Sequence, residues 1–300
     1  MKVVVLAGGT GGAALAAGIQ LITPDHELTV IANTADDDDF WGLRVCPDLD
    51  AVIYRLAGLF NEETGYGVKG DTFHTLDALA RAGEDTWFRI GDRDFATHLL
   101  RSEMLARECS LTETSLELCR RYGVRARVLP MADEPVRTRF TTDRGDLSFQ
   151  EYFVRERLQP KLLGIRFAGI DVARRSREVS QTLDTADLVV IGPSNPLISI
   201  APILELLRDA LVRDRTIAVT PIVGGAALKG PTAEMMRALG RTPDPVEVAR
   251  MYREVAGAFV LDERDQDVAA EIEALGYRVI VCDTVMRDGG RTLAKAVLSV

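Results

Sequence analysis

Residues 2–14, KVVVLAGGTGGAA, join an apolar run directly to a glycine-rich turn and decide how the fold begins. The run to Ala7 predicts a buried first strand, because β-branched residues favour strands. A helical stretch follows the glycines. Within the turn, Gly9-x-Gly11-x-x-Ala14 fits the G-x-G-x-x-G/A spacing, in which bare backbone N–H groups meet phosphate oxygens. This strand, turn and helix predict the start of a parallel α/β sheet.

The alternation of strand and helix returns beyond about residue 163. Between Val124 and Val154 the apolar period changes to two, and Asp143-Arg144-Gly145 indicates a hairpin. The sequence therefore predicts a Rossmann-like, mostly parallel sheet with helices on both faces, built from about 1–60 and 163–300. A smaller helix-and-hairpin subdomain is expected at about 61–162. The segments read as strands after 163 are IRFAGID, ADLVVIG, RTIAVTP, AFVLD and YRVIVCD.

Composition is that of a soluble globular protein, with 47% hydrophobic and 27% charged residues. The net charge of −9 argues against non-specific binding to nucleic acid or anionic membranes. No apolar run reaches the roughly 18 residues of a membrane span. Four scattered cysteines and three histidines form no CxxC or HExxH motif. This disfavours a zinc enzyme and favours a reducing, cytoplasmic location.

The first glycine turn is a candidate phosphate site, because open α/β sheets bind ligands beyond the carboxyl ends of their strands. In a dinucleotide-binding fold an acidic residue ends the second strand, but here Asn33 holds that place. NAD is therefore disfavoured, and another nucleotide or phosphate ligand is favoured. A tight turn without a ligand is the alternative. The turn consists of Gly8, Gly9, Thr10, Gly11 and Gly12.

A second loop, IGPSNPLIS at 191–199, offers Gly192, Ser194 and Asn195 just before a helix N-terminus. Such a position is a ready anion site. Pro196 follows Asn195, so the loop is no G-x-S-x-G elbow and Ser194 is a poor candidate for an acyl nucleophile. The alternative is that a serine of this loop only caps the helix.

A third loop, TPIVGGAALKGPT at 220–232, contains Gly224, Gly225 and Lys229. It resembles a phosphate loop but does not satisfy G-x-x-x-x-G-K-[ST], so it is not a Walker A motif. The alternative is a solvated lysine at a helix start.

The stretch NTADDDDFWGLRVCPDLD, residues 33–50, leaves the second predicted strand. A calcium EF-hand is excluded, because Trp41 falls at its fifth position and a strand precedes it. Hard oxygen ligands favour Mg²⁺ over zinc, and Mg²⁺ would help an acidic protein hold an anionic diphosphate. The alternatives are a solvated acidic loop and, for Asp48, a cap on the next helix. The candidate metal ligands are Asp36, Asp37, Asp48 and Asp50.

The segment TWFRIGDRDF, residues 86–95, combines aromatic and basic side chains. Trp87 and Phe88 are suited to packing on a planar ring, and Arg89 and Arg93 supply positive charge. A core aromatic pair with a surface network of arginines and aspartates is the alternative.

Six segments occur in an order that is informative as a whole: LAGGTGGAAL, NTADDDDFWGLRVCPDLDAVIYRLAG, GYGVKGDTF, WFRIGDRDFATHL, IGPSNPLISIAPIL and PIVGGAALKGPTAEMM. Together they span nearly the whole chain and resemble the CofD family, the 2-phospho-L-lactate transferases of coenzyme F-420 biosynthesis. The resemblance implies a magnesium-dependent transferase. Its donor would be lactyl-2-diphospho-5′-guanosine or, in many bacteria, the enolpyruvyl analogue. Its acceptor would be the ribityl hydroxyl of the deazaflavin FO (7,8-didemethyl-8-hydroxy-5-deazariboflavin), and GMP would leave.

The resemblance also assigns roles to residues. Asp50 and Arg89 map to the FO-binding positions of the family, which makes TWFRIGDRDF, with Trp87, the expected acceptor site. Asp50 is the expected catalytic residue, orienting and deprotonating the ribityl hydroxyl. On physical grounds, the loops Gly8–Gly12, Gly192–Asn195 and Gly224–Lys229, together with Asn33, are expected to cradle the guanylyl diphosphate, with Mg²⁺ held by aspartates of 33–50.

Two other functions stay open on the sequence alone. Asp48-x-Asp50 superficially matches the metal-binding DxD of nucleotide-sugar glycosyltransferases, although that motif ends a strand and this one opens a predicted helix. A nucleotide-binding regulator of the gluconeogenesis-factor type shares the GGTGG and acidic segments. A homodimer is expected for such a fold, and the sequence does not choose between lactyl and enolpyruvyl donors.

Overall fold

The computed structural model describes residues 1–23, 27–227 and 230–299. Its centre is a sheet of seven strands, all paired in parallel, in the order β14-β13-β10-β9-β1-β2-β5. The predicted Rossmann-like α/β class is confirmed. The strands are β1 (Lys2–Ala7), β2 (Glu27–Ala32), β5 (Arg127–Pro130), β9 (Leu188–Ile191), β10 (Thr216–Val219), β13 (Ala258–Asp262) and β14 (Arg278–Cys282).

The strand order reverses between β1 and β9, which are neighbours in the sheet although they are far apart in the chain. Open α/β sheets bind ligands at such a switch point, beyond the carboxyl ends of the strands. The Gly192 N–H donates to the Leu6 carbonyl at 2.9 Å, so the loop after β9 begins against β1. The first two predicted ligand loops are therefore neighbours.

Helices cover both faces of the sheet, as predicted. Val3 and Val5 of β1 share a core with α1, α2, α5 and α11, whereas Val4 and Leu6 share one with α6, α7, α9 and α10. This alternation follows from the two-residue period of a strand. The helices on the first face are α1 (Gly9–Ile22), α2 (Pro47–Leu56), α5 (Leu111–Arg121) and α11 (Arg291–Leu298). Those on the second are α6 (Arg177–Thr185), α7 (Ala201–Leu207), α9 (Pro245–Tyr252) and α10 (Ala269–Ala274).

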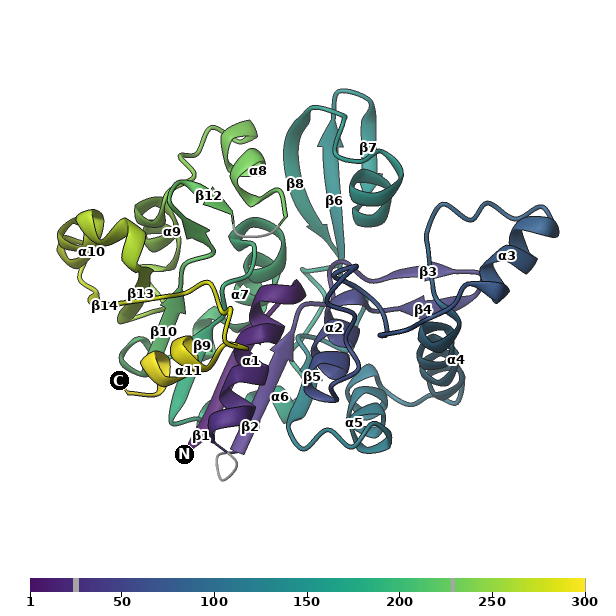
Figure 1. Cartoon of the computed structure of the whole chain (residues 1–300), viewed down its shortest axis with the longest axis horizontal. Coiled ribbons are helices and arrows are strands. Elements are labelled where there is room, and N and C mark those ends of the chain that lie inside the picture. The colour runs from purple at the N-terminus through teal and green to yellow at the C-terminus, as the bar shows by residue number, and fades with distance from the viewer. Residues whose placement is uncertain (24–26, 228–229, 300) are drawn as a thin grey trace.

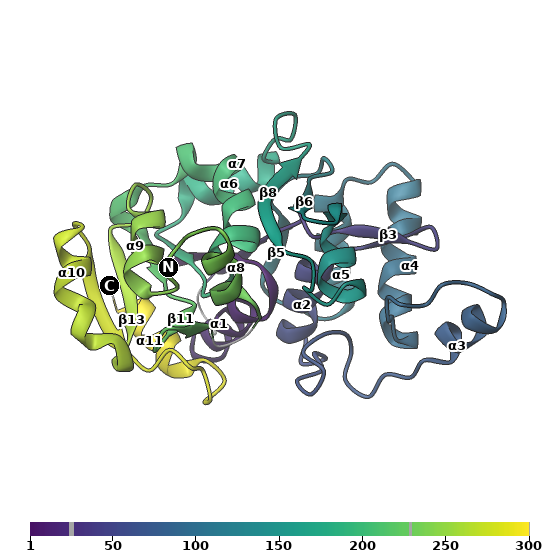
Figure 2. The same cartoon turned by 90° about the horizontal axis from the view of Figure 1, so that it is seen from above.

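Smaller elements surround the carboxyl edge of the sheet. An antiparallel sheet, ordered β7-β6-β8, rises beyond that edge (Figure 1). Helices α3 (His74–Arg81) and α4 (Asp92–Ala106) lie at the end of the molecule away from α10 (Figure 2). The antiparallel strands are β6 (Arg137–Thr142), β7 (Gly145–Ser148) and β8 (Leu162–Ala168). The predicted hairpin at Asp143-Arg144-Gly145 is the β6–β7 pair.

The remaining elements are short. Apart from the β3–β4 hairpin described below, they are β11 (Ile222–Val223), β12 (Ala226–Ala227), α8 (Thr232–Ala238) and the short helical segments η1 (Glu151–Arg155), η2 (Pro196–Ile200), η3 (Arg208–Ala210), η4 (Arg213–Arg215) and η5 (Glu263–Val268). Within the described ranges, no helix has both the length and the apolar character that crossing a membrane requires.

Two strands lie in a different sheet from the one predicted. The sequence assigns IRFAGID to the parallel sheet, but β8 pairs antiparallel with β6. It assigns residues 127–130 to the subdomain at 61–162, but β5 pairs in parallel with β2 at the sheet edge. The burial patterns explain the exchange. Three of four β5 residues are buried, as in a core strand, whereas β8 is mostly half-buried, as in a sheet covered on one side.

The acidic stretch is more ordered than a predicted loop. Its aspartate run enters a hairpin of β3 (Asp38–Phe40) and β4 (Leu43–Val45). Trp41 and Gly42 form the two-residue turn with φ of 50° and 78°. Such turns need left-handed backbone at both central residues, which glycine adopts freely and tryptophan adopts only under tertiary constraint.

Candidate active site

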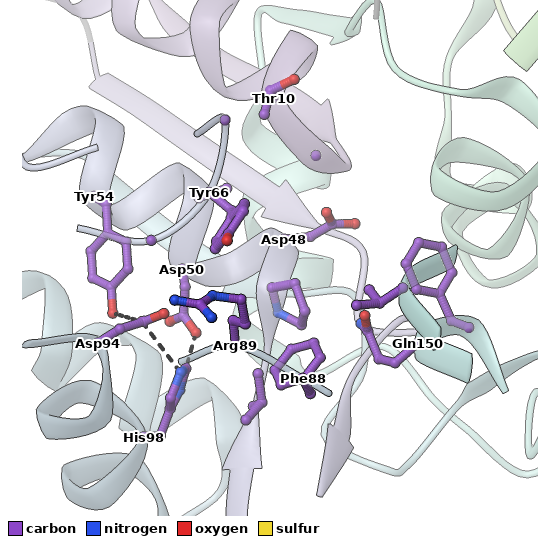
Figure 3. Close-up of a pocket in the computed structure, with 18 of the residues that line it drawn as sticks. Thr10, Asp48, Asp50, Tyr54, Tyr66, Phe88, Arg89, Asp94, His98 and Gln150 are labelled. Carbon is purple, nitrogen blue, oxygen red and sulfur yellow. Dashed lines mark hydrogen bonds and ion pairs between the residues drawn. The ribbon is translucent and has the colours of Figure 1, made fainter. Parts of the chain in front are cut away.

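A cavity of about 470 Å³ opens at the carboxyl edge of the sheet, between α1, α2 and α4 (Figure 3). We name its two ends after the residues that line them. The glycine end consists of Gly9, Thr10 and Asp48, and the aromatic end consists of Asp50, Tyr54, Trp87, Phe88, Arg89, Asp94 and His98. Of the residues predicted from sequence, the cavity thus brings together Gly9, Thr10, Asp48, Asp50, Trp87 and Arg89.

Asn33, which is buried and does not line the cavity, connects Asp48 of the glycine end to a second buried carboxylate, Asp36, which does not line it either. Its Nδ2 donates to Asp48 Oδ2 at 2.9 Å and to Asp36 Oδ2 at 3.1 Å. Thr138 Oγ1 donates to the other Asp36 oxygen at 2.9 Å. Burial raises the pKa of Asp48 to about 6, although Asn33 and the Gly9 N–H lower it. Burial, followed by the charge of Asp48, raises the pKa of Asp36 well above its ordinary value.

Asp37 is buried but does not line the cavity. Burial raises its pKa to about 7, against the opposing effects of the Cys46 thiol and of three arginines. Among the described atoms, its Oδ1 has no hydrogen-bond partner. The structure therefore separates Asp37 from the carboxylates that face the cavity.

Asp50 faces α4, although it follows Asp48 by only two residues on α2. Residues i and i+2 of a helix point about 200° apart around its axis. Arg101 Nη1 donates to Asp50 Oδ2 at 3.1 Å, and Nη2 donates to Oδ1. Both side chains are buried. Burial alone would lower the pKa of Arg101, but the Asp50 carboxylate holds it above its ordinary value.

Tyr54, Asp94 and His98 extend this network. The Tyr54 hydroxyl donates to Asp94 Oδ1 at 2.7 Å, and His98 Nε2 lies 3.2 Å from the same oxygen. His98 Nδ1 lies 3.6 Å from Asp50 Oδ2 (Figure 3). Burial raises the pKa of Asp94, but His98, Tyr54 and Arg101 together hold it below its ordinary value. Tyr54, Asp94, His98 and Arg101 were not singled out from sequence, although the polar residues at 94, 98 and 101 share one helix face.

Two clusters of carboxylates, Asp50 with Asp94 and Asp36 with Asp48, differ in how well they suit a metal ion. Among described side chains, Asp50, Asp94 and His98 have ligand atoms within 4.8 Å of one another. Arg101 Nη1, however, bonds Asp50 and lies 3.3 Å from His98 Nδ1. A divalent cation there would meet the guanidinium charge, so that group does not fit.

Asp36 and Asp48 fit Mg²⁺ better. They offer oxygen ligands, and Asp48 reaches the cavity. Burial raises the pKa of both carboxyl groups, and the charge of Asp48 raises that of Asp36 further.

Aromatic rings form another part of the cavity wall. Phe40 of β3 stacks on Phe88 with ring centroids 4.0 Å apart and planes 1° apart, and Trp87 meets Phe40 edge-on at 5.5 Å. Phe88 and Trp87 line the cavity, whereas Phe40 supports them from behind. The Arg89 guanidinium lies 4.3 Å from the centre of the Phe73 ring. A rigid apolar face suits a planar ligand.

The first glycine loop is shaped by close backbone contacts. A Cβ on Gly11 would lie 2.1 Å from the Pro193 carbonyl oxygen, and one on Gly8 would lie 2.4 Å from Ser199 Cβ. A Cβ on Gly12 would lie 2.6 Å from Ala7 Cβ. These three glycines let α1 start directly against the loop after β9, and this start exposes Gly9 and Thr10 to the cavity.

The second loop supports the first instead of lining the cavity. Ser194 Oγ accepts the Gly8 N–H at 3.2 Å, and Asn195 Oδ1 accepts the Leu197 N–H at 2.9 Å. Asn195 thus caps η2. Gly192 holds the loop against β1, as described above.

The third loop lies apart from the cavity lining over its described residues. Gly224 and Gly225 form the turn between β11 and β12, with φ of 59° and 73°. The Gly224 N–H donates to both oxygens of Asp265 at 2.9 and 3.0 Å. Lys229, the third candidate of this loop, lies outside the described residues.

Sequence comparison decides the family. The profile described as "2-phospho-L-lactate transferase CofD" matches residues 3–298. The chain belongs to the CofD family. The 2-phospho-L-lactate transferases of Methanosarcina acetivorans and Methanothermobacter thermautotrophicus are each 38% identical to it. The alignments cover 98% of this chain and 97% of the first, and 96% of this chain and 94% of the second.

A bacterial relative is named as a transferase of a different group. The phosphoenolpyruvate transferase of Streptomyces griseus is 37% identical over 99% of this chain and 96% of its own. A crystal structure of a UPF0052-family protein from Bacillus halodurans superposes with a TM-score of 0.63 at 16% identity, covering 99% of this chain and 98% of that one. The structural likeness supports the fold, and the sequence relatives support a CofD-family transferase.

Proposed function

We propose that this CofD-family chain transfers a phospholactyl or phosphoenolpyruvyl group from a guanylyl-diphosphate donor to the ribityl hydroxyl of FO, with release of GMP. The observation that carries the proposal is one cavity with two unlike ends. The glycine end suits a diphosphate and the aromatic end suits a planar ring, with Asp50 beside it. The named transferase relatives supply the reaction class.

The glycine end would bind the donor. Helix α1 has 14 residues and begins at Gly9, so its first N–H groups and its dipole favour an anion at Thr10. The Gly192–Asn195 loop acts here by holding the α1 start in place. The Gly224–Gly225 turn would contact the donor only beyond the cavity lining, toward the nucleoside.

The aromatic end would bind FO. The deazaflavin ring would lie on the exposed face of Phe88, with Trp87 at its edge, and Phe40 would keep that face in place. Arg89, which lines the same wall, would meet polar groups of the acceptor. The ribityl chain would then extend toward Asp50 and the glycine end.

The transfer is a single displacement at phosphorus. The ribityl oxygen attacks the phosphorus that carries lactate, forming a new P–O bond. The bond from that phosphorus to the bridging oxygen breaks, and GMP leaves with that oxygen. Asp50 orients the attacking hydroxyl and accepts its proton. Such reactions depend mainly on positioning and charge neutralisation.

Asp48 would be the carboxylate that holds Mg²⁺ at the cavity, with Asp36 beside it through Asn33. Bound there, the ion would neutralise charge on the diphosphate. Asp37 is outside this group, and Asp50 already has Arg101 as its counter-ion.

Binding and donor screening test the proposal. FO fluorescence should change saturably on titration with the protein, and guanylyl-activated lactate or enolpyruvate should be consumed only when FO is present. Absence of FO binding would favour a nucleotide-binding regulator. Consumption of a UDP- or GDP-sugar without FO would favour a glycosyltransferase.

A further inference from the structure

A buried polar network joins α2 to α4 at the aromatic end of the cavity. Asp50 and Tyr54 are four residues apart on α2, and Asp94, His98 and Arg101 recur on α4 at spacings of four and three. Each set therefore shares one helix face. All five side chains are buried, with Arg101, His98 and Tyr54 each 1% exposed.

Arg101 and His98 both lie against the Asp50 carboxylate. The guanidinium of Arg101 bonds both Asp50 oxygens as a fork, which fixes the plane of the carboxylate as well as its position. His98 Nδ1 stands 3.6 Å from Asp50 Oδ2, and its ring lies against Asp94, which Tyr54 holds in turn. Arg101 itself does not line the cavity, so it reaches the substrates only through Asp50.

The same chain contains an ordinary version of this fork. Arg175 Nη1 and Nη2 bond Asp209 Oδ1 and Oδ2 at 2.5 and 3.1 Å, on the surface, where the Asp209 side chain is 71% exposed. Burying a fork removes two charges from water, and a buried ion pair is seldom more stabilising than apolar residues of the same volume. A gain in stability therefore does not explain why Arg101 pairs with Asp50 beside the cavity.

We propose that Arg101 is a positioning residue of the transfer reaction, which holds the Asp50 carboxylate in the orientation required by the attacking ribityl hydroxyl. His98, backed by Asp94 and Tyr54, lies beside Arg101 at the Asp50 Oδ2 atom and limits the movement of the carboxylate there. This inference rests on the proposed function, because it assigns Arg101 a role in acceptor activation and none in donor binding.

The test compares Arg101→Ala with Arg175→Ala, which removes the matched surface fork. Arg101→Ala should lower kcat with FO about 100-fold, because small displacements of a reacting group cost that much. The KM for the guanylyl donor should stay near the wild-type value. Guanidinium ion, added below denaturing concentrations, should restore part of the kcat of Arg101→Ala. Arg175→Ala should retain the wild-type kcat.

The inference would be overturned if folded Arg101→Ala kept a kcat within about threefold of wild type, or if Arg175→Ala lost as much kcat as Arg101→Ala. It would also be overturned if Arg101→Ala changed the donor KM together with kcat and guanidinium restored neither. If Arg101→Ala does not fold, His98→Leu decides. Its kcat should fall about tenfold at constant donor KM, and an unchanged kcat would contradict the inference. Wild-type protein that turns over no FO would instead reject the proposed function, so the two failures are distinguishable.

Discussion

Asp48 and Asp50 stand two residues apart near the start of α2, yet their surroundings differ in charge. Asp50 is paired with Arg101 in a buried fork. Asp48 shares the Asn33 amide with a second carboxylate, Asp36, and no cation of the described residues contributes to its pKa of about 6. Both line one cavity.

The difference between Asp48 and Asp50 shows how one turn of α2 can place a carboxylate beside each of two substrates. A helix directs residues i and i+2 to different sides, so the DxD spacing here does not bring both carboxylates onto one metal ion. The chain supplies its own cation at the aromatic end, whereas the glycine end suits a cation from solution. The following predictions separate the two ends.

Removal of divalent cations should have the largest effect. EDTA should abolish turnover and added Mg²⁺ should restore it, because Asp48 and the donor diphosphate need a counter-ion. FO binding, measured by FO fluorescence, should persist in EDTA, because the counter-ion of Asp50 is Arg101 and not a metal ion. Full turnover in EDTA would remove the metal from the account.

Asp50→Asn should lower kcat with FO about 1,000-fold, because the amide keeps the shape of the carboxylate but accepts no proton. Steady-state kinetics at saturating Mg²⁺ measure this effect, and the Mg²⁺ requirement should not change. Asp209→Asn, in the surface fork, is the matched control and should be fully active. Unchanged turnover and unchanged FO affinity in Asp50→Asn would refute the role of Asp50.

Asn33→Ala should act at the glycine end alone. Loss of the amide that orients Asp48 should raise the Mg²⁺ concentration for half-maximal activity about 10- to 100-fold. A Mg²⁺ titration of the initial rate measures this, and FO affinity should be unchanged. Thr185→Ala, which also removes a polar side chain but lies on α6 outside the cavity lining, controls for the substitution. An unaltered Mg²⁺ requirement would separate Asn33 from the metal site.

Phe88→Leu should have the smallest effect, confined to the aromatic end. Losing one stacking face should raise the KM for FO about fivefold, while the donor KM stays constant. Phe167→Leu, on β8 in the antiparallel sheet, is the control. An FO affinity equal to wild type would place the ring elsewhere.

Much of the fold was predictable, because its signals are local. The strand, glycine turn and helix at 2–22 follow from apolar period and glycine spacing, and so do most later helices. The exchange of β5 and β8 between sheets was not predictable, because a short apolar run does not identify its partner strand. The β3–β4 hairpin was missed, since Trp41 occupies a turn position that normally indicates glycine or asparagine.

The site was predictable in part for a related reason. Asp48, Asp50 and the first glycine loop were found because they follow strand ends. Arg101 and His98 were missed because a buried ion pair depends on two helices meeting, although the polar residues at 94, 98 and 101 share one helix face. Asp36, Asp37, Asp48 and Asp50 are all buried, but only Asp48 and Asp50 line the cavity, and the aspartate run did not reveal this difference.

The central claim is that the two ends of one cavity bring a guanylyl donor and FO together for transfer. The direct measurement is turnover of purified protein with Mg²⁺, FO and each guanylyl donor, with the products identified by mass. The account predicts GMP together with FO that has gained a phospholactyl or phosphoenolpyruvyl group. Intact FO after complete donor consumption, or no consumption of either donor, would contradict it.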